Sequence, residues 1–272
     1  MDELTRTRAV AARLLALPEC GSTNAELRER ATDAEGWPHL SVLLTDTQTS
    51  GRGRLDRTWS TPPGTAMAVS VLLRELPADV GDWGWIPLAA GVAMVDAVAA
   101  QLPGHEVGLK WPNDVLVDGR KICGILAEVT GSAVIVGTGV NTVMAAAQLP
   151  VPTATSFAAL GADVDVDRLL TEYLAGLSAA VAQLAETADA EASGLHAAAT
   201  ARCHTLGQDV DVSLPGGGML TGRAVRLASD GRLVVDDGHG EHEVSAGDVV
   251  HVRRVWSADQ RRCSRSVGGR RL

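Results

Sequence analysis

The chain has 272 residues and a formal net charge of −9, with 46% apolar residues but 3% aromatic ones. This length allows one large domain and a small second one, with a core built from Ala, Val and Leu. Seven arginines and one aspartate lie after residue 252, so the body before them carries −15. Such an acidic body argues against a binding surface for nucleic acid or for an anionic membrane.

The cysteines and the apolar segments favour a reduced, aqueous compartment. The four cysteines lack any C-x-x-C spacing, which argues against a zinc site or a disulfide framework. Charged residues interrupt the first twenty positions, so no signal peptide is apparent. The longest apolar run, 86–100, is too short to span a bilayer and contains Asp96. We expect a soluble cytoplasmic protein.

The N-terminal region predicts two helices. Leu, Val and Ala recur at helical spacing over 4–17, and Pro18 ends the run. Thr23-x-x-Glu26 is a capping-box pattern that opens a second helix, to about Ala31. Hydroxyls and N–H groups at this helix start could form a polar cup for a ligand, although helix capping alone is the commoner reason for such residues.

An arginine- and glycine-rich loop follows a buried strand predicted over 40–45. Arg52, Arg54 and Arg57 lie within six residues, among glycines. Glycines let backbone N–H groups approach a ligand, and arginine forks match phosphate or carboxylate, so the loop is predicted to close over an anion. The alternatives are a solvated basic loop or an RNA-binding segment. RNA is disfavoured because aromatic residues do not interleave with the arginines and the body is acidic.

A strand over 65–73 and a buried helix over 83–100 precede the segment Lys110-Trp111-Pro112-Asn113-Asp114, which lies between two short predicted strands. Pro112 holds the residue before it extended, so a helix cannot continue here. Of the 24 Lys and Arg in the chain, Lys110 and Lys121 are the only lysines. Because lysine is a compact point charge and arginine a wide fork, Lys110 is predicted to meet a ligand at this strand end. The plainer interpretation is a surface lysine beside a core tryptophan.

The next predicted strands form an antiparallel sheet. Asp118-Gly119 is a tight-turn pattern between strands over 115–117 and 121–129, and a further strand covers 132–140. The end of that strand, Gly137-Thr138-Gly139-Val140-Asn141, has small residues that let a ligand lie against the backbone. Asn141 could pair with the edge of a base, although an ordinary turn asparagine is the plainer interpretation.

The predicted secondary structure changes from helix to short strands in the C-terminal region. One or two amphipathic helices are predicted over 167–199, where His196 looks structural. Five short alternating strands between 206 and 252 predict a small closed barrel. The Arg-, Ser- and Gly-rich residues that follow are predicted to be disordered. The predicted division is a domain over 1–204, a second over 205–255 and a tail over 256–272.

Between residues 20 and 252 the chain resembles biotin protein ligases, the biotin–[acetyl-CoA-carboxylase] ligases, of the type without an N-terminal DNA-binding domain. The motifs that carry the resemblance are Ser22-Thr23-Asn24, Gln48 with Gly51-Arg52-Gly53-Arg54-x-x-Arg57-x-Trp59, Lys110 to Asp114, Lys121-x-x-Gly124-Ile-Leu-x-Glu128 and Gly137-x-Gly139-Val-Asn141. The resemblance implies an α+β fold. A mixed sheet flanked by helices, like the catalytic domain of class II aminoacyl-tRNA synthetases, would be followed by an SH3-like barrel.

The resemblance also implies a two-step reaction. Biotin and ATP give biotinyl-5′-AMP and pyrophosphate, with Mg²⁺ as cofactor, and the biotinyl group then passes to a lysine of a biotin carboxyl carrier domain of a carboxylase. The carboxylate of biotin is ionised at pH 7, so the first step needs cations rather than a Ser-His-Asp arrangement. The acceptor amine titrates near ~10.4 and must lose a proton, for which Asp114 is the candidate.

The resemblance assigns three overlapping sets of site residues. The expected biotin contacts are Ser22, Thr23, Asn24, Gln48, Gly51, Arg52, Gly53, Arg54 and Lys110. The expected ATP and adenylate contacts are Arg52, Arg54, Arg57, Trp59, Lys110, Asn113 and Asn141. The expected catalytic residues are Lys110, Arg54 and Asp114, and no metal ligand is assigned.

Three positions depart from the family pattern. Asp56 stands where the family usually has Gly, which puts a carboxylate among the arginines; Thr138 and Cys123 also differ. Two other functions stay open. One is a lipoate or octanoate ligase of the same superfamily, which the Gly-Arg loop and the terminal barrel disfavour. The other is a non-catalytic biotin-binding regulator. We expect no nucleic-acid or membrane partner, and a monomer or weak dimer.

Overall fold

The computed structural model describes residues 4–55, 57–214, 217–245 and 248–251. Its larger part is a seven-stranded sheet in the order β1-β2-β5-β9-β8-β7-β6. β1 pairs with β2 in parallel, and every later pair in this order is antiparallel. The strands are β1 (Arg13–Ala16), β2 (Ser41–Thr45), β5 (Ala66–Leu73), β6 (Val107–Lys110), β7 (Asp114–Val117), β8 (Arg120–Thr130) and β9 (Ala133–Asn141). The expected mixed sheet is confirmed.

The sequences of β5 and of the β7–β8 turn follow from burial and from turn geometry. Every residue of β5 is buried, which accounts for a sequence that is apolar except at Ser70. β7 and β8 are joined by the expected turn at Asp118 and Gly119, whose φ angles are 50° and 74°. Two consecutive positive φ angles are what a two-residue hairpin turn requires.

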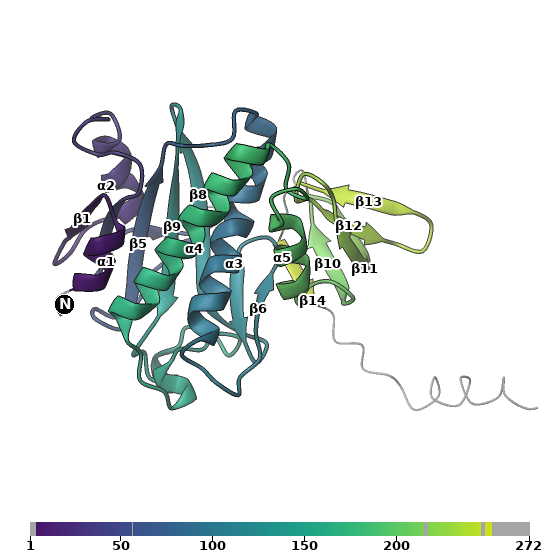
Figure 1. Ribbon diagram of the computed structural model, residues 1–272. Coiled ribbons are helices and arrows are strands. Elements are labelled where there is room, and N and C mark those ends of the chain that lie inside the picture. Colours follow the sequence, from purple (N-terminus) through teal and green to yellow (C-terminus); the bar gives the residue numbers. More distant parts are fainter. Residues whose placement is uncertain (1–3, 56, 215–216, 246–247, 252–272) are drawn as a thin grey trace, which may run out of the picture.

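Helices cover the two faces of the sheet. On one face α2 (Thr23–Arg30) packs against β2, β5 and β9. On the other, α3 (Ile86–Ala99) and α4 (Val166–Thr187) lie side by side, with α1 (Thr5–Val10) against α4 (Figure 1). α3 is buried nearly all round apart from Asp96 and Ala99, as its largely apolar sequence predicts. It begins at Ile86, three residues later than expected, because a 3₁₀ turn, η1 (Val80–Trp85), precedes it.

The single helix expected over 4–17 is wrong. The helix ends at Val10, and Arg13–Ala16 form β1, where Leu14 lies beside Val42. Pairing with the buried strand β2 outweighs the helical propensity of this Ala- and Leu-rich run, because tertiary context overrides local preference.

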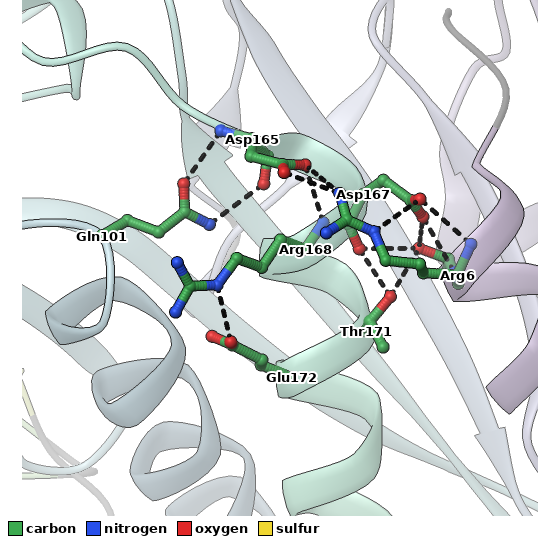
Figure 2. Close-up of polar contacts among 8 residues, drawn as sticks. Arg6, Gln101, Asp165, Asp167, Arg168, Thr171 and Glu172 are labelled. Atoms are coloured by element: carbon green, nitrogen blue, oxygen red, sulfur yellow. Dashed lines mark hydrogen bonds and ion pairs between the residues drawn. The ribbon is translucent and has the colours of Figure 1, made fainter.

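Polar contacts hold α1 to the start of α4 (Figure 2). Asp167 accepts hydrogen bonds from the Thr7 backbone and hydroxyl at 2.8 and 2.7 Å, and from the Arg6 backbone and Nε at 3.0 and 3.1 Å. Burial raises the pKa of Asp167, but these hydrogen bonds outweigh it and hold the pKa at about 2. The Asp167 side chain is 15% exposed but that of Arg6 is 52% exposed, so solvent screens the Arg6 ion pair more than the part-buried hydrogen bonds from Thr7.

We expect Asp167→Ala to lower the free energy of unfolding by ~2 kcal/mol, because a carboxylate with several charge-assisted hydrogen bonds is lost. Since the folded pKa lies below the unfolded value of ~3.9, the contribution is complete above about pH 4 and is lost as the pH falls toward 2. Denaturant unfolding of wild type and variant between pH 2 and 7 checks this. Glu172→Ala, which removes an exposed i,i+4 pair with Arg168 on the same helix, should cost at most ~0.5 kcal/mol. Equal effects of the two substitutions would contradict the expectation.

A second sheet follows α4 and α5 (Leu195–Arg202). Its five strands run antiparallel in the order β13-β12-β11-β10-β14. They are β10 (Asp209–Ser213), β11 (Met219–Leu227), β12 (Leu233–Asp236), β13 (Glu241–Val244) and β14 (Asp248–His251). The expected strands are present, but the expected closed barrel is wrong for the described residues. Within the described residues β13 and β14 stand at opposite edges of this sheet and do not pair. The predicted tail lies outside the described residues.

The second sheet shares its core with the first. The Trp85 indole donates to the Ser229 carbonyl at 2.9 Å, and the His196 ring packs edge-on to Trp85 with ring centroids 5.6 Å apart. His196 Nε2 also lies 3.2 Å from the Leu227 carbonyl oxygen. His196 is therefore structural, as expected. Among the described helices, none has the length and apolar character to cross a membrane.

Candidate active site

A pocket opens on the face of the large sheet that carries α2. Because side chains alternate along a strand, this face presents Ala68 and Ser70 of β5, Gly137 and Gly139 of β9, and Gly124 of β8. Of these, Ala68, Gly124, Gly137 and Gly139 line the pocket, and because they are small its floor is largely backbone. The pocket is lined further by Ser22, Thr23, Asn24, Gln48, Arg52, Gly53, Arg54, Leu55, Arg57, Thr58, Trp59, Asn113, Asp114, Lys121, Ile125, Leu126 and Thr138.

One end of the pocket is formed by the start of α2. Ser22, rather than the expected Thr23, is the N-cap: its hydroxyl accepts from the Ala25 N–H at 3.4 Å. Thr23 is thereby free of capping and donates from both its N–H and its hydroxyl to Gln48 Oε1, at 2.8 and 3.1 Å. The Thr23 and Gln48 side chains, both largely buried, form a fixed polar pair at this end.

The Gly-Arg loop is a short hairpin over the pocket, formed by β3 (Gly51–Arg52) and β4 (Thr58–Trp59). Gly51 does not line the pocket but lies beneath it, where a Cβ would collide with Gln48 and the Trp59 carbonyl. Arg54 Nη1 donates to Asn113 Oδ1 at 3.2 Å, so the hairpin tip is tied to the turn after β6. Asp56 lies outside the described residues.

The strand β9 leaves room for the indole of Trp59. A Cβ on Gly139 would lie 2.8 Å from two atoms of the indole, and one on Gly137 would collide with the Asn24 amide. Thr138, between them, points its hydroxyl to the opposite face of the sheet, where it lies 2.8 Å from the Tyr173 hydroxyl. Thr138 therefore contributes its backbone to the pocket lining, while its hydroxyl links β9 to Tyr173 on α4.

The lysine in the pocket is Lys121, not Lys110. Lys121 Nζ lies 2.6 Å from Asp114 Oδ1, without the angular geometry of a directed hydrogen bond. A β-bulge explains its direction: Val115 pairs with Cys123 while the adjacent Leu116 pairs with Lys121. The extra residue in β8 turns Lys121 onto the face that Gly124 occupies, since a bulge re-aims the side chains on either side of it.

Lys110 lies at the end of β6, and neither it nor Asn141 is among the residues that line the pocket. Asn141 donates instead to the Thr155 carbonyl at 2.9 Å. The structure thus does not bring Lys110 and Asn141 into this pocket, where both were expected from the sequence. The signal for Lys121 was present in the sequence, because it is the second of two lysines and begins a motif that ends at Glu128.

The residue after Lys110 joins the two sheets. Trp111 donates its backbone N–H to the Thr205 hydroxyl and its indole N–H to the Gly231 carbonyl, each at 3.0 Å. Thr205 Oγ1 also lies 3.1 Å from His251 Nε2. Burial, with the neighbouring charges of Lys110 and His204, lowers the pKa of His251 to about 4, so His251 is neutral at pH 7. Lys110 thus belongs to the junction between the sheets.

A second cavity, of about 420 Å³, adjoins the pocket at this junction. The two share Arg54, Asn113, Ile125 and Leu126 as lining residues. The second cavity extends past Trp111 and Pro112 to the β11–β12 turn at Gly231. The shared Arg54 and Asn113 lie where a ligand longer than the first pocket would pass into the second.

The site has cations and amides but no preassembled metal cluster. Within the described ranges, no group of three His, Cys, Asp or Glu side chains converges. Asp114 is the acidic residue among the described lining residues, and its Oδ1 accepts no directed hydrogen bond. The three described cysteines are all buried and free. Burial raises the pKa of the Cys20 thiol to about 11, so this thiol beside the pocket is not a thiolate nucleophile.

Comparison with known proteins gives a consistent result. The biotin/lipoate A/B protein ligase family matches residues 20–141, and the biotin protein ligase C-terminal domain matches residues 205–252. The biotin–[acetyl-CoA-carboxylase] ligase of Mycobacterium tuberculosis is 41% identical over 86% of this chain and 87% of its own length. The bifunctional ligase/repressor of Escherichia coli is 32% identical, over 47% of this chain and 40% of its own length.

Solved structures agree with the sequence comparisons. The biotin protein ligase from Aquifex aeolicus, in complex with biotin and ATP, superposes on this chain with a TM-score of 0.72 and is 27% identical to it. The match covers 89% of this chain and 99% of that one. The similarity therefore extends through both sheets.

Proposed function

Because the chain belongs to the biotin protein ligase family, we propose that its pocket activates biotin with ATP as biotinyl-5′-AMP and then passes the biotinyl group to a lysine of a carrier protein. The observation that carries the proposal is the position of Lys121. Its ammonium, held by Asp114, lines one pocket with Arg54, Arg57 and the Thr23–Gln48 pair. The site thus offers fixed polar groups for a neutral ring and cations for an anionic reaction centre.

The first step requires two anions to meet. The biotin carboxylate attacks the α-phosphate of ATP, a bond forms between carboxylate oxygen and phosphorus, and pyrophosphate leaves. No base is needed, because the carboxylate is already ionised at pH 7. Lys121, Arg54 and Arg57 lower the repulsion and stabilise the charge that develops on phosphorus, and the enclosing hairpin holds the reactants in line.

The fixed polar pair at the start of α2 is assigned to the biotin ring system. Thr23 N–H and Oγ1 already fix Gln48 Oε1, so the Gln48 amide nitrogen is turned toward other partners. A cyclic urea offers one acceptor and two donors, which match a hydroxyl, an amide and backbone groups. Ser22, Thr23, Gln48 and the backbone near Arg52 are the proposed contacts.

The nucleotide is assigned to the Trp59 end of the pocket and to the adjoining cavity. The first pocket, at about 180 Å³, is smaller than the ~300–1,000 Å³ usual for ligand sites, so two substrates need additional space. Arg54 and Asn113 line both cavities and are placed to contact the phosphates or the sugar. Trp59 offers an aromatic face.

Asp114 and Asn113 are the residues that would hold Mg²⁺. Magnesium in nucleotide sites is bound through one or two carboxylates together with phosphate oxygens, and it keeps several waters. Asp114 Oδ1, which faces the Lys121 ammonium at 2.6 Å, fits that requirement once the ammonium turns to the phosphate. When bound, the ion supplies charge neutralisation for the phosphates.

In the second step the amine of the acceptor lysine attacks the adenylate carbonyl, and AMP leaves. The amine must first lose a proton, since a free lysine titrates near ~10.4. Asp114 is the proposed acceptor of that proton, because it is the carboxylate among the described lining residues. Once Lys121 pairs with phosphate, Asp114 is no longer neutralised by it.

The proposed partner is the biotin carboxyl carrier domain of a carboxylase, in the cytoplasm. The relative from Mycobacterium tuberculosis is named for acetyl-CoA carboxylase, and the buried free cysteines suit a reducing compartment. The proposed division remains 1–204 and 205–255. The test is incorporation of biotin into a purified carrier domain, with its acceptor lysine and with that lysine changed to Arg. Labelling that needs ATP and the lysine supports the proposal, whereas absence of labelling with an active carrier contradicts it.

Gly139→Ala should raise KM for ATP about five- to tenfold or more. The added Cβ overlaps the Trp59 indole, and overpacking of this kind costs ~1–3 kcal/mol, which displaces the aromatic face. Steady-state adenylation over a range of ATP concentrations measures the effect. Gly240→Ala is the matched control, because a Cβ there meets nothing within 4 Å. An unchanged KM in Gly139→Ala would show that Trp59 does not contact the nucleotide.

A further inference from the structure

The carboxylate of Glu128 joins three elements that border the pocket. Its Oε2 accepts from Asn24 Nδ2, on α2, at 2.7 Å. Its Oε1 lies 2.6 Å from Arg28 Nη2, also on α2, and 3.5 Å from Arg52 Nη2, on the Gly-Arg hairpin. The Glu128 side chain is 22% exposed. One partly buried carboxylate on β8 therefore holds both the helix and the hairpin.

This contact lies at the end of the pocket opposite Lys121. Gly124, Leu126 and Glu128 alternate onto the pocket face of β8, and Lys121 reaches the same face through the bulge. Lys121 and Glu128 are seven positions apart, which is roughly 20 Å of extended strand. Arg52 is therefore held far from the cation that is assigned to the phosphate, and close to the start of α2.

Glu128 also determines how Asn24 presents its amide. Asn24 Oδ1 accepts from the Ser70 hydroxyl at 2.6 Å, and its Nδ2 donates to the Leu126 carbonyl at 3.2 Å as well as to Glu128. An ionised carboxylate only accepts hydrogen bonds, so it fixes the amide with its nitrogen toward β8. Asn24 is 5% exposed and rests on Gly137, where a Cβ would collide with it. The protein thus holds the Asn24 amide in one orientation at the pocket lining.

We propose that Glu128 is a positioning residue for biotin: it orients Asn24 and holds Arg52, so that the hairpin is tied down over the end of the pocket that receives the ring system. The inference rests on the proposed function. Glu128 acts through Asn24 and Arg52 and touches neither reacting group. Its loss therefore weakens biotin binding and leaves the chemical step intact.

Glu128→Gln should raise KM for biotin about five- to tenfold, the size expected when a partly exposed ion pair and an orienting hydrogen bond are weakened together. At saturating biotin, kcat for adenylation should stay within about twofold, because Lys121 and Arg54 are untouched. Calorimetric titration with biotin alone should give the same loss of affinity. Glu26→Gln is the matched control: it removes an equally short ion pair, 2.6 Å to Arg30, on α2 away from the pocket lining.

A double-mutant cycle separates this role from general stability. If Glu128 acts partly through Arg52, the effect of Glu128→Gln on biotin affinity should shrink in the Arg52→Gln background and persist in the Arg28→Gln background. Full additivity with Arg52→Gln, or a fall in kcat at unchanged KM, overturns the proposal. Should Glu128→Gln fail to fold, Arg52→Gln alone must raise KM for biotin, and an unchanged KM overturns the proposal as well. Failure of the proposed function would look different, since the wild-type protein would then show no biotin-dependent reaction at all.

Discussion

Replacement of Lys121 by Gln is expected to lower the rate of biotinyl-adenylate formation by about 10²- to 10³-fold, the usual effect of removing one group that stabilises charge in a transition state. The Lys121 ammonium lies in the pocket at 2.6 Å from Asp114. It is a compact cation that can move from that carboxylate to a phosphate when the nucleotide binds. Single-turnover formation of the adenylate measures the effect, since it separates chemistry from product release.

Lys110→Gln is the matched control, because it makes the same change at the other lysine of the chain. Lys110 is not among the residues lining the pocket, so adenylation should change by no more than about twofold, as for substitutions away from a site. Its loss should instead raise the pKa of His251, which the Lys110 charge helps to lower. If Lys110→Gln were the inactive variant and Lys121→Gln the active one, the placement of the site would be wrong.

Arg54→Gly should release biotinyl-AMP about 10- to 100-fold faster than the wild type, because one charged hydrogen bond is worth ~1.5–3 kcal/mol. Arg54 ties the hairpin tip to Asn113 at 3.2 Å and lines both cavities. Without it the reactive mixed anhydride escapes and acylates lysines of bystander proteins. Filter-binding release of labelled adenylate, together with biotinylation of added albumin, measures both consequences.

Two further variants separate the charge of Arg54 from backbone freedom. Arg54→Ala should leak nearly as fast as Arg54→Gly if the guanidinium is responsible, and Arg54→Lys should leak less because it keeps the charge. Retention of the adenylate by Arg54→Gly at the wild-type rate would refute the assignment of the hairpin as the cover of the site.

Much of the fold could be predicted from local patterns. The apolar run of β5 and the Asp118-Gly119 turn gave strands whose observed bounds differ from the expected ones by a residue or two. The errors arose where long-range pairing decides. Arg13–Ala16 is a strand because β2 lies beside it, and closure of the second sheet depends on whether its two edges meet. Neither the pairing of β1 with β2 nor the separation of these edges can be predicted from local sequence alone.

The candidate site was predicted in its motifs but not in its geometry. Thr23, Gln48, Arg54 and Asp114 come together in one pocket, and their roles toward a ligand stay predictions. Lys121 rather than Lys110 lines the pocket because of a bulge of one residue in β8, which reverses the direction of Lys121. Strand alternation alone would point Lys121 away from the face that Gly124 occupies.

Of the three positions that depart from the family pattern, two lie in the core and one, Asp56, lies outside the described residues. Thr138 and Cys123 lie in the core, and the Thr138 hydroxyl meets Tyr173 behind the sheet, so neither side chain belongs to the pocket. Burial raises the pKa of the Cys123 thiol well above its usual range, so it remains a neutral thiol in the core. The expectations for Asp56, for the tail and for a monomer or weak dimer stay predictions.

ATP–pyrophosphate exchange tests the central claim most directly. The purified wild-type protein is assayed with biotin, with lipoate and with neither, and Lys121→Gln is assayed beside it. We expect exchange that requires biotin and is nearly abolished in Lys121→Gln. Exchange supported by lipoate would place the activity in the sister branch of the superfamily, and tight biotin binding without exchange would make the protein a regulator; either result would contradict the proposed function.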